Sequence, residues 1–333
     1  MRKVSALCLA AVLVVPACTG GGGRDAARID PAQLAAFAPL PAAMESPTNP
    51  VGEEKTDLGR MLYYDTRLSR DQDLSCNSCH KLDAYGVDGR QFSVGTQGQL
   101  GVRNSPSVYN AAGQVAQFWD GRAPTVEEQA KGPILNPVEM AMPSAEAVVT
   151  RLEAVPAYRA AFKRAFGGSD PVTFENVGLA IGAFERRLTT PAPWDRFLLG
   201  DTAALTPAER KGFNAFAANG CQACHNGALV GGALFQRIGV VQPWPDRSDI
   251  GRAAITHAAA DTLVFKVPSL RNVERTAPYF HRGTAATLPE AVRLMARHQI
   301  GRDLTPEQVG EIVAFLHALT GEAPAAYLAP RGQ

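Results

Sequence analysis

The sequence has no excess of charge of one sign and no long apolar run. Its 333 residues include 33 Lys and Arg against 32 Asp and Glu, a formal net charge of +1. This balance offers little to neutralise a phosphate backbone, so a nucleic-acid partner is not expected. No apolar run reaches the roughly 18 residues of a membrane-spanning helix. Hydrophobic residues at 46% and charged residues at 20% are typical of globular proteins and exclude disorder, collagen and coiled coil.

Residues 1–17 begin with a short cationic start and continue as an apolar run that ends in small residues, which is typical of an export signal. Cys18, Thr19 and four glycines follow. The junction resembles a bacterial lipoprotein processing site, although Pro16 is unusual there, and it predicts lipidation of Cys18. Plain cleavage near Ala17 is the alternative. In both cases we expect a periplasmic protein with residues 18–45 as a flexible tether. Its only expected contact with the membrane is the lipid on Cys18, if Cys18 is lipidated.

The four remaining cysteines form two copies of one motif. Cys76-Asn77-Ser78-Cys79-His80 and Cys221-Gln222-Ala223-Cys224-His225 both have the form C-x-x-C-H, the attachment signal for c-type haem. The two thiols bond the porphyrin vinyl groups, and the histidine that follows becomes an axial ligand of the iron.

Three other uses of these cysteines are disfavoured. Paired C-x-x-C motifs of a zinc site usually lie about 15–20 residues apart, far closer than these two. A thioredoxin-like redox pair does not require a histidine after each motif. A disulfide across so short a loop removes little chain entropy. The sequence therefore predicts two covalently bound haem c groups.

Helix signals dominate the rest of the sequence, and strand signals are few. Apolar residues at helical spacing predict helices over residues 57–64, 145–166 and 173–188. Capping boxes predict three more, which start after Thr206, Thr287 and Thr305. The best strand signal covers residues 233–241. Segments rich in Gly and Pro are expected to be irregular, over residues 84–115 and 226–285.

At about 150 residues per domain the length predicts two domains, and the succession of helix, haem motif and later helices occurs twice. We therefore predict a mainly α fold of two cytochrome-c-like domains, each with one haem, long irregular loops and little β structure. The first domain is assigned to residues 46–190 and the second to residues 191–322, with Pro191-Ala192-Pro193 as the linker. Residues 323–333 are expected to form a tail that packs back on the first domain.

The sixth ligand of each iron decides its role, because a second protein ligand favours electron transfer and an open position favours chemistry on a small molecule. No histidine lies between His80 and His225. The first haem therefore has no local histidine for its sixth position, which predicts an open site. Met295 and His298 share one face of the helix predicted from residue 288. Spacing alone favours core packing for Met295 and does not choose between the two as a ligand.

The chain resembles the bacterial di-haem cytochrome c peroxidases from about residue 50 to residue 321. The matching stretches include LGRMLYYDTRLSRDQDLSCNSCH, VRNSPSVYN, QFWDGRAPTVEEQAKGP, VEM, GCQACHNGALVGG, FKVPSLRNVERTAPYFHRG and EAVRLMARHQIG. The resemblance implies a first haem that reduces hydrogen peroxide to water. It also implies a second haem, ligated by His225 and Met295, that takes electrons from a small redox protein, a cytochrome c or a cupredoxin. Members of this family are often homodimers.

The resemblance also implies roles for side chains around the first haem. Glu139 corresponds to the acid/base carboxylate, Gln129 to its polar neighbour, and Trp119 to an aromatic residue between the two haems. Uneven cleavage of the peroxide O–O bond requires a proton to move from one oxygen to the other, and one positioned carboxylate can do both transfers, worth about 10²–10⁴ in rate. Without the resemblance, Glu139 would be a solvated loop residue and Trp119 a core residue.

Two further sites follow from the resemblance alone. A calcium ion between the domains is implied at Asn104 and the backbone carbonyls of Thr276 and Pro278, although the sequence has no acidic calcium-binding loop. Arg271 and His281 are implied as contacts of haem propionates.

One departure from the family concerns the first haem. The family usually has a histidine sixteen residues after the first haem histidine, which caps the iron in the resting oxidised form. Here Thr96 stands at that position. Threonine is a poor iron ligand, so we expect an open first haem already in the oxidised protein.

Two other functions stay open at this point. The first is a di-haem oxidase that modifies a residue of a partner protein, a branch that resembles this chain but uses tyrosine where Met295 stands. The second is a non-catalytic di-haem electron carrier, which predicts two closed irons and leaves Gln129 and Glu139 unexplained.

Overall fold

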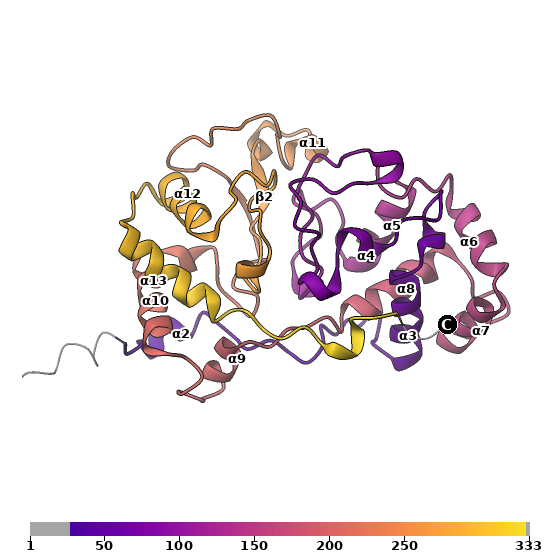
Figure 1. The fold of residues 1–333 in the computed structure, drawn as a ribbon, viewed down its shortest axis with the longest axis horizontal. Coiled ribbons are helices and arrows are strands. Elements are labelled where there is room, and N and C mark those ends of the chain that lie inside the picture. The colour runs from indigo at the N-terminus through magenta and orange to yellow at the C-terminus, as the bar shows by residue number, and fades with distance from the viewer. Residues whose placement is uncertain (1–26, 331–333) are drawn as a thin grey trace, which may run out of the picture.

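The computed structural model describes residues 27–330, which form two lobes side by side (Figure 1). The predicted export signal and the predicted lipidation site at Cys18 lie outside the described residues. Within residues 27–330 no helix is both long and apolar enough to cross a bilayer. Helices and irregular segments make up most of this part of the chain, and its sheet has only two strands. The predicted mainly α fold is therefore confirmed.

The first lobe is a group of helices that pack around α8 (Phe174–Glu185). The others are α3 (Glu53–Tyr63), α5 (Val126–Leu135), α6 (Ala145–Glu153) and α7 (Pro156–Phe166). α3 and α5 lie directly against α8, and α7 lies against α3. Their apolar faces form one core that includes Leu58, Leu62, Phe162 and Ile181. This helical group supports the short α4 (Cys76–Cys79), which carries the first haem motif.

The second lobe is built on an aromatic core. Its helices are α9 (Pro193–Leu198), α10 (Pro207–Ala218), α12 (Leu288–Ile300) and α13 (Pro306–His317). Trp194, Phe213 and Phe315 are fully buried, with ring centroids 5.0, 5.1 and 5.2 Å apart. Such aromatic pairs add stability beyond the area they bury. On the side that faces the first lobe, β1 (Phe235–Arg237) pairs antiparallel with β2 (Val264–Lys266), beside α11 (Ala253–Thr256) (Figure 1).

Both ends of the described chain cross from one lobe to the other (Figure 1). The chain begins on the second lobe, where α2 (Pro31–Leu34) leads to Phe37, which packs edge to face on Trp194 at 5.5 Å. The Leu40 amide donates to Asp195 over 2.7 Å. The predicted flexible tether is therefore wrong for residues 27–45, because this segment buries apolar side chains in the second lobe's core.

The C-terminal segment crosses in the other direction and packs on α3. Tyr64 donates from its hydroxyl to the Tyr327 carbonyl over 2.7 Å, and the Tyr327 ring lies 5.4 Å from that of Phe184. The two lobes are thus joined by segments from both ends of the described chain as well as by the connection through residues 190–193.

The helices predicted from capping boxes all begin where the sequence placed them. α10, α12 and α13 start directly after Thr206, Thr287 and Thr305, and each threonine hydroxyl accepts a backbone N–H three residues later. The single helix predicted over residues 145–166 is wrong. The chain is extended at Val155, because proline at the next position has no N–H and disfavours helical geometry in the residue before it.

The strand prediction was only partly right. The signal over residues 233–241 gives a strand of three residues, β1, and its partner β2 was not predicted. The long segments over residues 84–115 and 226–285 are mostly irregular, as predicted, with short helical turns. These two segments face each other between the lobes and form part of the walls of the site described next.

Candidate functional site

The first haem motif presents an imidazole in the form that iron binds. The backbone N–H of His80 donates to the Cys76 carbonyl over 2.9 Å, which closes the short α4. The His80 Nδ1 atom lies 3.4 Å from the Gly86 carbonyl, so the Nε2 atom is left for a metal. Burial lowers the pKa of His80, which favours the neutral ring. The Cys76 and Cys79 thiols are free to form thioethers.

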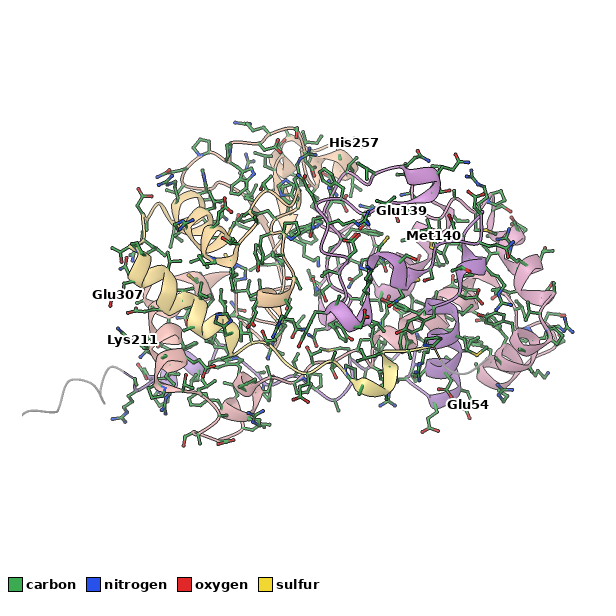
Figure 2. All side chains as sticks on the ribbon, viewed as in Figure 1. Glu54, Glu139, Met140, Lys211, His257 and Glu307 are labelled. Carbon is green, nitrogen blue, oxygen red and sulfur yellow. The ribbon has the colours of Figure 1, made fainter. Side chains whose placement is uncertain are left out.

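A cavity of about 870 Å³ opens beside this motif, a volume typical of cofactor sites. Its walls come from both lobes and include Cys76, Cys79, His80, Trp119, Gln129 and Glu139. Figure 2 shows Glu139 near the boundary between the lobes. Two thiols, one free imidazole nitrogen and an adjoining cavity are the features that a covalently attached haem requires, so the residues at this site fit that group.

Glu139 is held in this cavity with one oxygen occupied. Its Oε1 atom accepts a hydrogen bond of 2.8 Å from the Asn136 side chain. Burial raises the pKa of Glu139, against opposing effects of the Arg122 charge and the Asn136 bond. A second cavity of about 270 Å³ is also lined by Arg122, Asn136 and Glu139. Glu139 therefore lies where the two cavities meet, with its Oε2 atom available to hold a proton.

The segment around Thr96 packs on the backbone of Glu139 and turns its own side chain elsewhere. The Thr96 amide donates to the Glu139 carbonyl over 2.8 Å. The Thr96 hydroxyl donates to Asp71 and accepts from Arg70, each over 3.1 Å. The contact between the two segments requires Gly95, since a Cβ atom there would lie 1.9 Å from the Val138 carbonyl.

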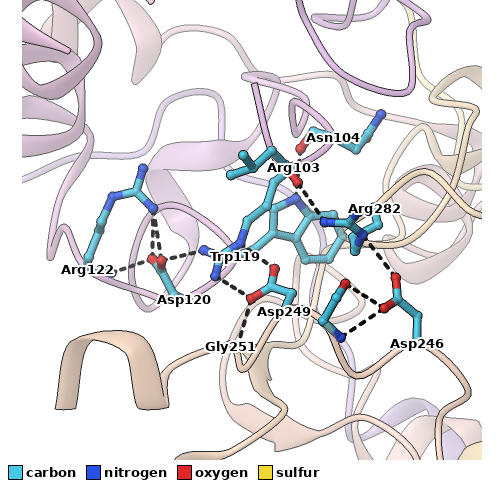
Figure 3. A network of polar contacts seen from close by, with 11 residues as sticks. Arg103, Asn104, Trp119, Asp120, Arg122, Asp246, Asp249, Gly251 and Arg282 are labelled. Carbon is cyan, nitrogen blue, oxygen red and sulfur yellow. Dashed lines mark hydrogen bonds and ion pairs between the residues drawn. The ribbon is translucent and has the colours of Figure 1, made fainter. Parts of the chain in front are cut away.

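Trp119 lies within a network of polar contacts between the lobes (Figure 3). Its indole N–H donates to the Asn104 carbonyl over 2.8 Å. Arg103, from the first lobe, binds Asp249 of the second lobe over 2.7 and 2.8 Å and also pairs with Asp120. Asp120 in turn pairs with Arg122 over 2.9 Å. A continuous chain of charges thus runs from the second lobe past Trp119 to the cavity that holds Glu139.

The second haem motif follows α10 and has the same local geometry. Cys221 to Ala223 form a single 3-10 turn, and the His225 amide donates to the Cys221 carbonyl over 3.0 Å. Burial lowers the pKa of His225 to about 4, against smaller effects of the Val230 and Pro268 carbonyls. A buried neutral imidazole that follows two free thiols again fits a c-type haem.

The two rival ligands on α12 have different surroundings. Met295 packs against a cluster of Ile238, Trp244, Leu263 and Phe265. The His298 Nδ1 atom lies 3.1 Å from the Gln242 carbonyl, and its ring lies 5.0 Å from that of Trp244. Trp119 packs against the same cluster as Met295. These contacts place Met295 and Trp119 on one apolar group, while His298 is bound to the neighbouring loop.

The predicted propionate contacts differ in how free they are. Arg271 makes four hydrogen bonds, two to Asp195 and two to the Ala228 carbonyl, which leave it one N–H. His281 is 2% exposed, and its Nε2 atom has no hydrogen-bond partner among residues 27–330. Its ring stacks on Phe265 at 4.1 Å. Both assignments stay predictions. Arg271 has only one N–H left with which to bind a propionate.

Asn104, a residue of the predicted calcium site, is a contact between the two lobes. The Asn104 amide donates to the His281 carbonyl over 2.8 Å, and its side-chain nitrogen donates to the Arg90 carbonyl over 2.8 Å. Thr276 and Pro278 lie in the segment that precedes His281. In the described part of the chain, no group of three or more His, Cys, Asp or Glu side chains could hold a metal ion. Calcium stays a prediction that rests on amide and carbonyl oxygens.

Sequence reasoning missed three charged residues of this site: Arg103, Asp249 and Lys266. Arg103 and Lys266 lie within stretches that carry the family resemblance, VRNSPSVYN and FKVPSLRN, and their place in these stretches was the available signal. Asp249 lies in a loop with no such signal. Its partner is far away in the sequence, which only the fold reveals.

Comparison with known proteins identifies the family of this chain. A family model described as di-haem cytochrome c peroxidase matches residues 53–203. The cytochrome c551 peroxidase of Pseudomonas aeruginosa is 46% identical over 298 residues, with 87% of this chain and 86% of the relative covered. That of Nitrosomonas europaea is 47% identical over 279 residues, with 83% and 82% covered. The solved structure of a MauG-like protein associated with microbial copper homeostasis has a TM-score of 0.75 at 30% identity, with 87% and 95% covered. The chain belongs to the di-haem cytochrome c peroxidase family.

Proposed function

We propose that this protein is a di-haem peroxidase that reduces hydrogen peroxide to water with electrons from a small redox protein, a cytochrome c or a cupredoxin. The observation that carries the proposal is the position of Glu139, a largely buried carboxyl beside the cavity of the first haem motif. An electron carrier has no use for an acid in that place. The relatives named cytochrome c551 peroxidase support the same activity.

The chain's own residues can move the protons that the reaction needs. Haem, which Cys76, Cys79 and His80 would hold, would supply the electrons for cleavage of the O–O bond. Glu139 takes a proton from one peroxide oxygen at its Oε2 atom and returns it to the other, while the Asn136 bond keeps Oε1 in place. Its raised pKa brings this carboxyl closer to the working pH, as a group that must both accept and donate requires. Gln129 orients the peroxide. With two further protons and two electrons, both oxygens leave as water.

A second haem, which Cys221, Cys224, His225 and Met295 would hold, would receive the electrons of the donor protein. Trp119 supports the passage between the haems, because its indole is fixed by Asn104 and packs against the cluster that Met295 also contacts. The Thr96 hydroxyl is bound to Asp71 and Arg70 and would supply no ligand to an iron held by His80. We therefore expect the oxidised protein to accept peroxide without prior reduction.

The remaining parts of the proposal concern location and assembly. The predicted export signal supports a periplasmic location, and the processing site that follows it supports a lipid anchor at Cys18. The family resemblance supports a homodimer with one calcium ion between the lobes. The second candidate function is an oxidase that acts on a partner protein. Met295, where that branch uses tyrosine, favours the peroxidase.

Steady-state turnover of the holoprotein with reduced cytochrome c and hydrogen peroxide tests the proposal. Glu139→Gln should lose about 10²–10⁴ in rate while both haems remain bound. Glu54→Gln, on the outer surface of α3 far from Glu139 (Figure 2), is the matched control and should keep the wild-type rate. Unchanged turnover in Glu139→Gln with two haems per chain would contradict the acid/base role. No turnover in the wild-type holoprotein would contradict the peroxidase itself.

A further inference from the structure

Lys266 reaches from the second lobe into the cavity of the first haem motif. It is the last residue of β2, and its backbone N–H donates to the Trp119 carbonyl over 2.8 Å. Its side chain lines the cavity, and its ammonium donates to the Gln114 side-chain oxygen in the first lobe. Only 5% of the residue is exposed. A charged group of one lobe is thus buried against the other.

This ammonium has no counter-ion among residues 27–330. Burial lowers the pKa of Lys266 to about 8, and no carboxylate opposes that effect. The other cations that line the cavity are all paired, Arg103 with Asp249, Arg122 with Asp120 and Arg282 with Asp246. A buried charge without a partner is strongly unfavourable, so an anion is expected at this place.

The chemistry of a c-type haem supplies that anion. Thioether bonds fix the vinyl edge of the porphyrin at Cys76 and Cys79, and the two propionates leave from the opposite edge. α4, which carries these cysteines, and β2, which ends at Lys266, lie on the facing sides of the two lobes (Figure 1). We infer that Lys266, with Gln114 beside it, binds a propionate carboxylate of the first haem, so that the second lobe takes part in holding the first lobe's cofactor. This rests on the haem assignment of the proposed function.

The position of Lys266 gives the contact a second consequence. Its backbone N–H binds the Trp119 carbonyl and its side chain would bind the propionate, so one residue of β2 contacts both the backbone of Trp119 and the charge next to the first haem. A positive charge near a haem favours its reduced state, because the oxidised iron carries one more positive charge. Lys266 therefore raises the reduction potential of the first haem and leaves that of the second unchanged.

Spectroelectrochemical titration of both haems in the holoprotein tests this inference. Lys266→Gln should move the first haem to a more negative potential with the second unmoved, and Lys266→Arg should keep most of the wild-type value. Lys211→Gln is the matched control, since Lys211 lies half exposed on the outer side of the second lobe (Figure 2) and should move neither potential. An unmoved first haem, or equal shifts of both haems, would overturn the inference. Absence of covalently bound haem in the wild type would instead overturn the proposed function.

Two further measurements separate the carboxylate of the cofactor from a free anion and guard against a variant that does not fold. Titration of the wild-type protein with inorganic phosphate should leave the first potential unchanged. A shift that Lys266→Gln abolishes would show that Lys266 binds a free anion and would overturn the assignment. In Lys266→Arg, the propionate bending band of the first haem should shift in the resonance Raman spectrum, because a planar fork replaces the ammonium. An unshifted band would equally contradict the contact.

Discussion

Arg103 offers the sharpest test of how the two lobes are held together. Its side chain is 16% exposed, and the two carboxylates that it binds, Asp120 and Asp249, are 5% and 10% exposed. Arg103→Gln leaves both carboxylates without this cation, and removal of one partner from a buried ion pair costs about 3–5 kcal/mol. Asp120 keeps Arg122, and Asp249 keeps the Gly251 amide at 2.9 Å. We therefore expect the lower end, about 3 kcal/mol.

Urea unfolding of the holoprotein measures this loss. Asp249→Asn in the Arg103→Gln background should recover part of it, because the second change removes an unpaired buried charge. Arg297→Gln is the matched control. Its pair with Asp303 is largely exposed, so the loss should stay below about 1 kcal/mol. Two results would refute this role of the Arg103–Asp249 ion pair between the lobes. One is a loss of stability in Arg103→Gln no larger than that of the control. The other is a double variant whose loss equals the sum of the two single losses.

The pH dependence of the same variant gives an independent check. Burial alone would raise the pKa of Asp249, but the Arg103 and Gly251 hydrogen bonds outweigh it and hold the pKa below its ordinary value. A lowered folded-state pKa contributes stability that is complete above the unfolded pKa and is lost as the pH falls through the folded pKa. The wild type should therefore exceed Arg103→Gln most at neutral pH, and the difference should shrink in acid. A difference that grows on acidification would refute the assignment.

Three more outcomes follow from the two haem sites. The acid limb of the kcat/KM profile should lie above the ordinary carboxyl pKa and vanish in Glu139→Gln, because burial raises the pKa of Glu139; a limb retained in the variant would assign it to another group. Spectra of the oxidised protein should show a high-spin first haem without prior reduction; a low-spin pair in the wild type would contradict the open site. Gly231→Ala should lower the midpoint of thermal unfolding, because φ at Gly231 is +128° and this backbone strain alone costs about 1–3 kcal/mol. The added Cβ atom would also lie 2.2 Å from the Pro268 carbonyl and 3.1 Å from the His225 Nδ1 atom. An unchanged midpoint would contradict this prediction.

Local signals predicted the parts of this fold that local physics decides. The threonine caps before α10, α12 and α13 are read from four consecutive residues, and they fix where each helix begins. The two C-x-x-C-H motifs likewise predict a turn that presents an imidazole. The break at Pro156 was also readable, and it was missed because apolar spacing continues across it.

The rest of the site depends on contacts between distant segments, which spacing does not reveal. Arg103 meets Asp249 and Lys266 meets Gln114 only because two irregular segments face each other between the lobes. The choice between Met295 and His298 needed the family resemblance, since both lie on one face of α12. The burial of residues 27–45 was missed because a short segment near a glycine run offers little pattern.

The crossing segments decide the order in which this protein can fold. The Leu40 amide donates to Asp195, which lies 155 residues later in the sequence. The Arg28 carbonyl accepts a hydrogen bond from the Asn214 side chain, 186 residues later. Arg60 binds the Ala329 carbonyl across 269 residues. Contacts between residues so far apart in the sequence form slowly. During synthesis from the N-terminus, Phe37 stays exposed until the aromatic core of the second lobe has formed. Neither lobe can therefore complete its folding before nearly the whole chain has been delivered, so the two haem modules are not separable units for truncation or domain exchange.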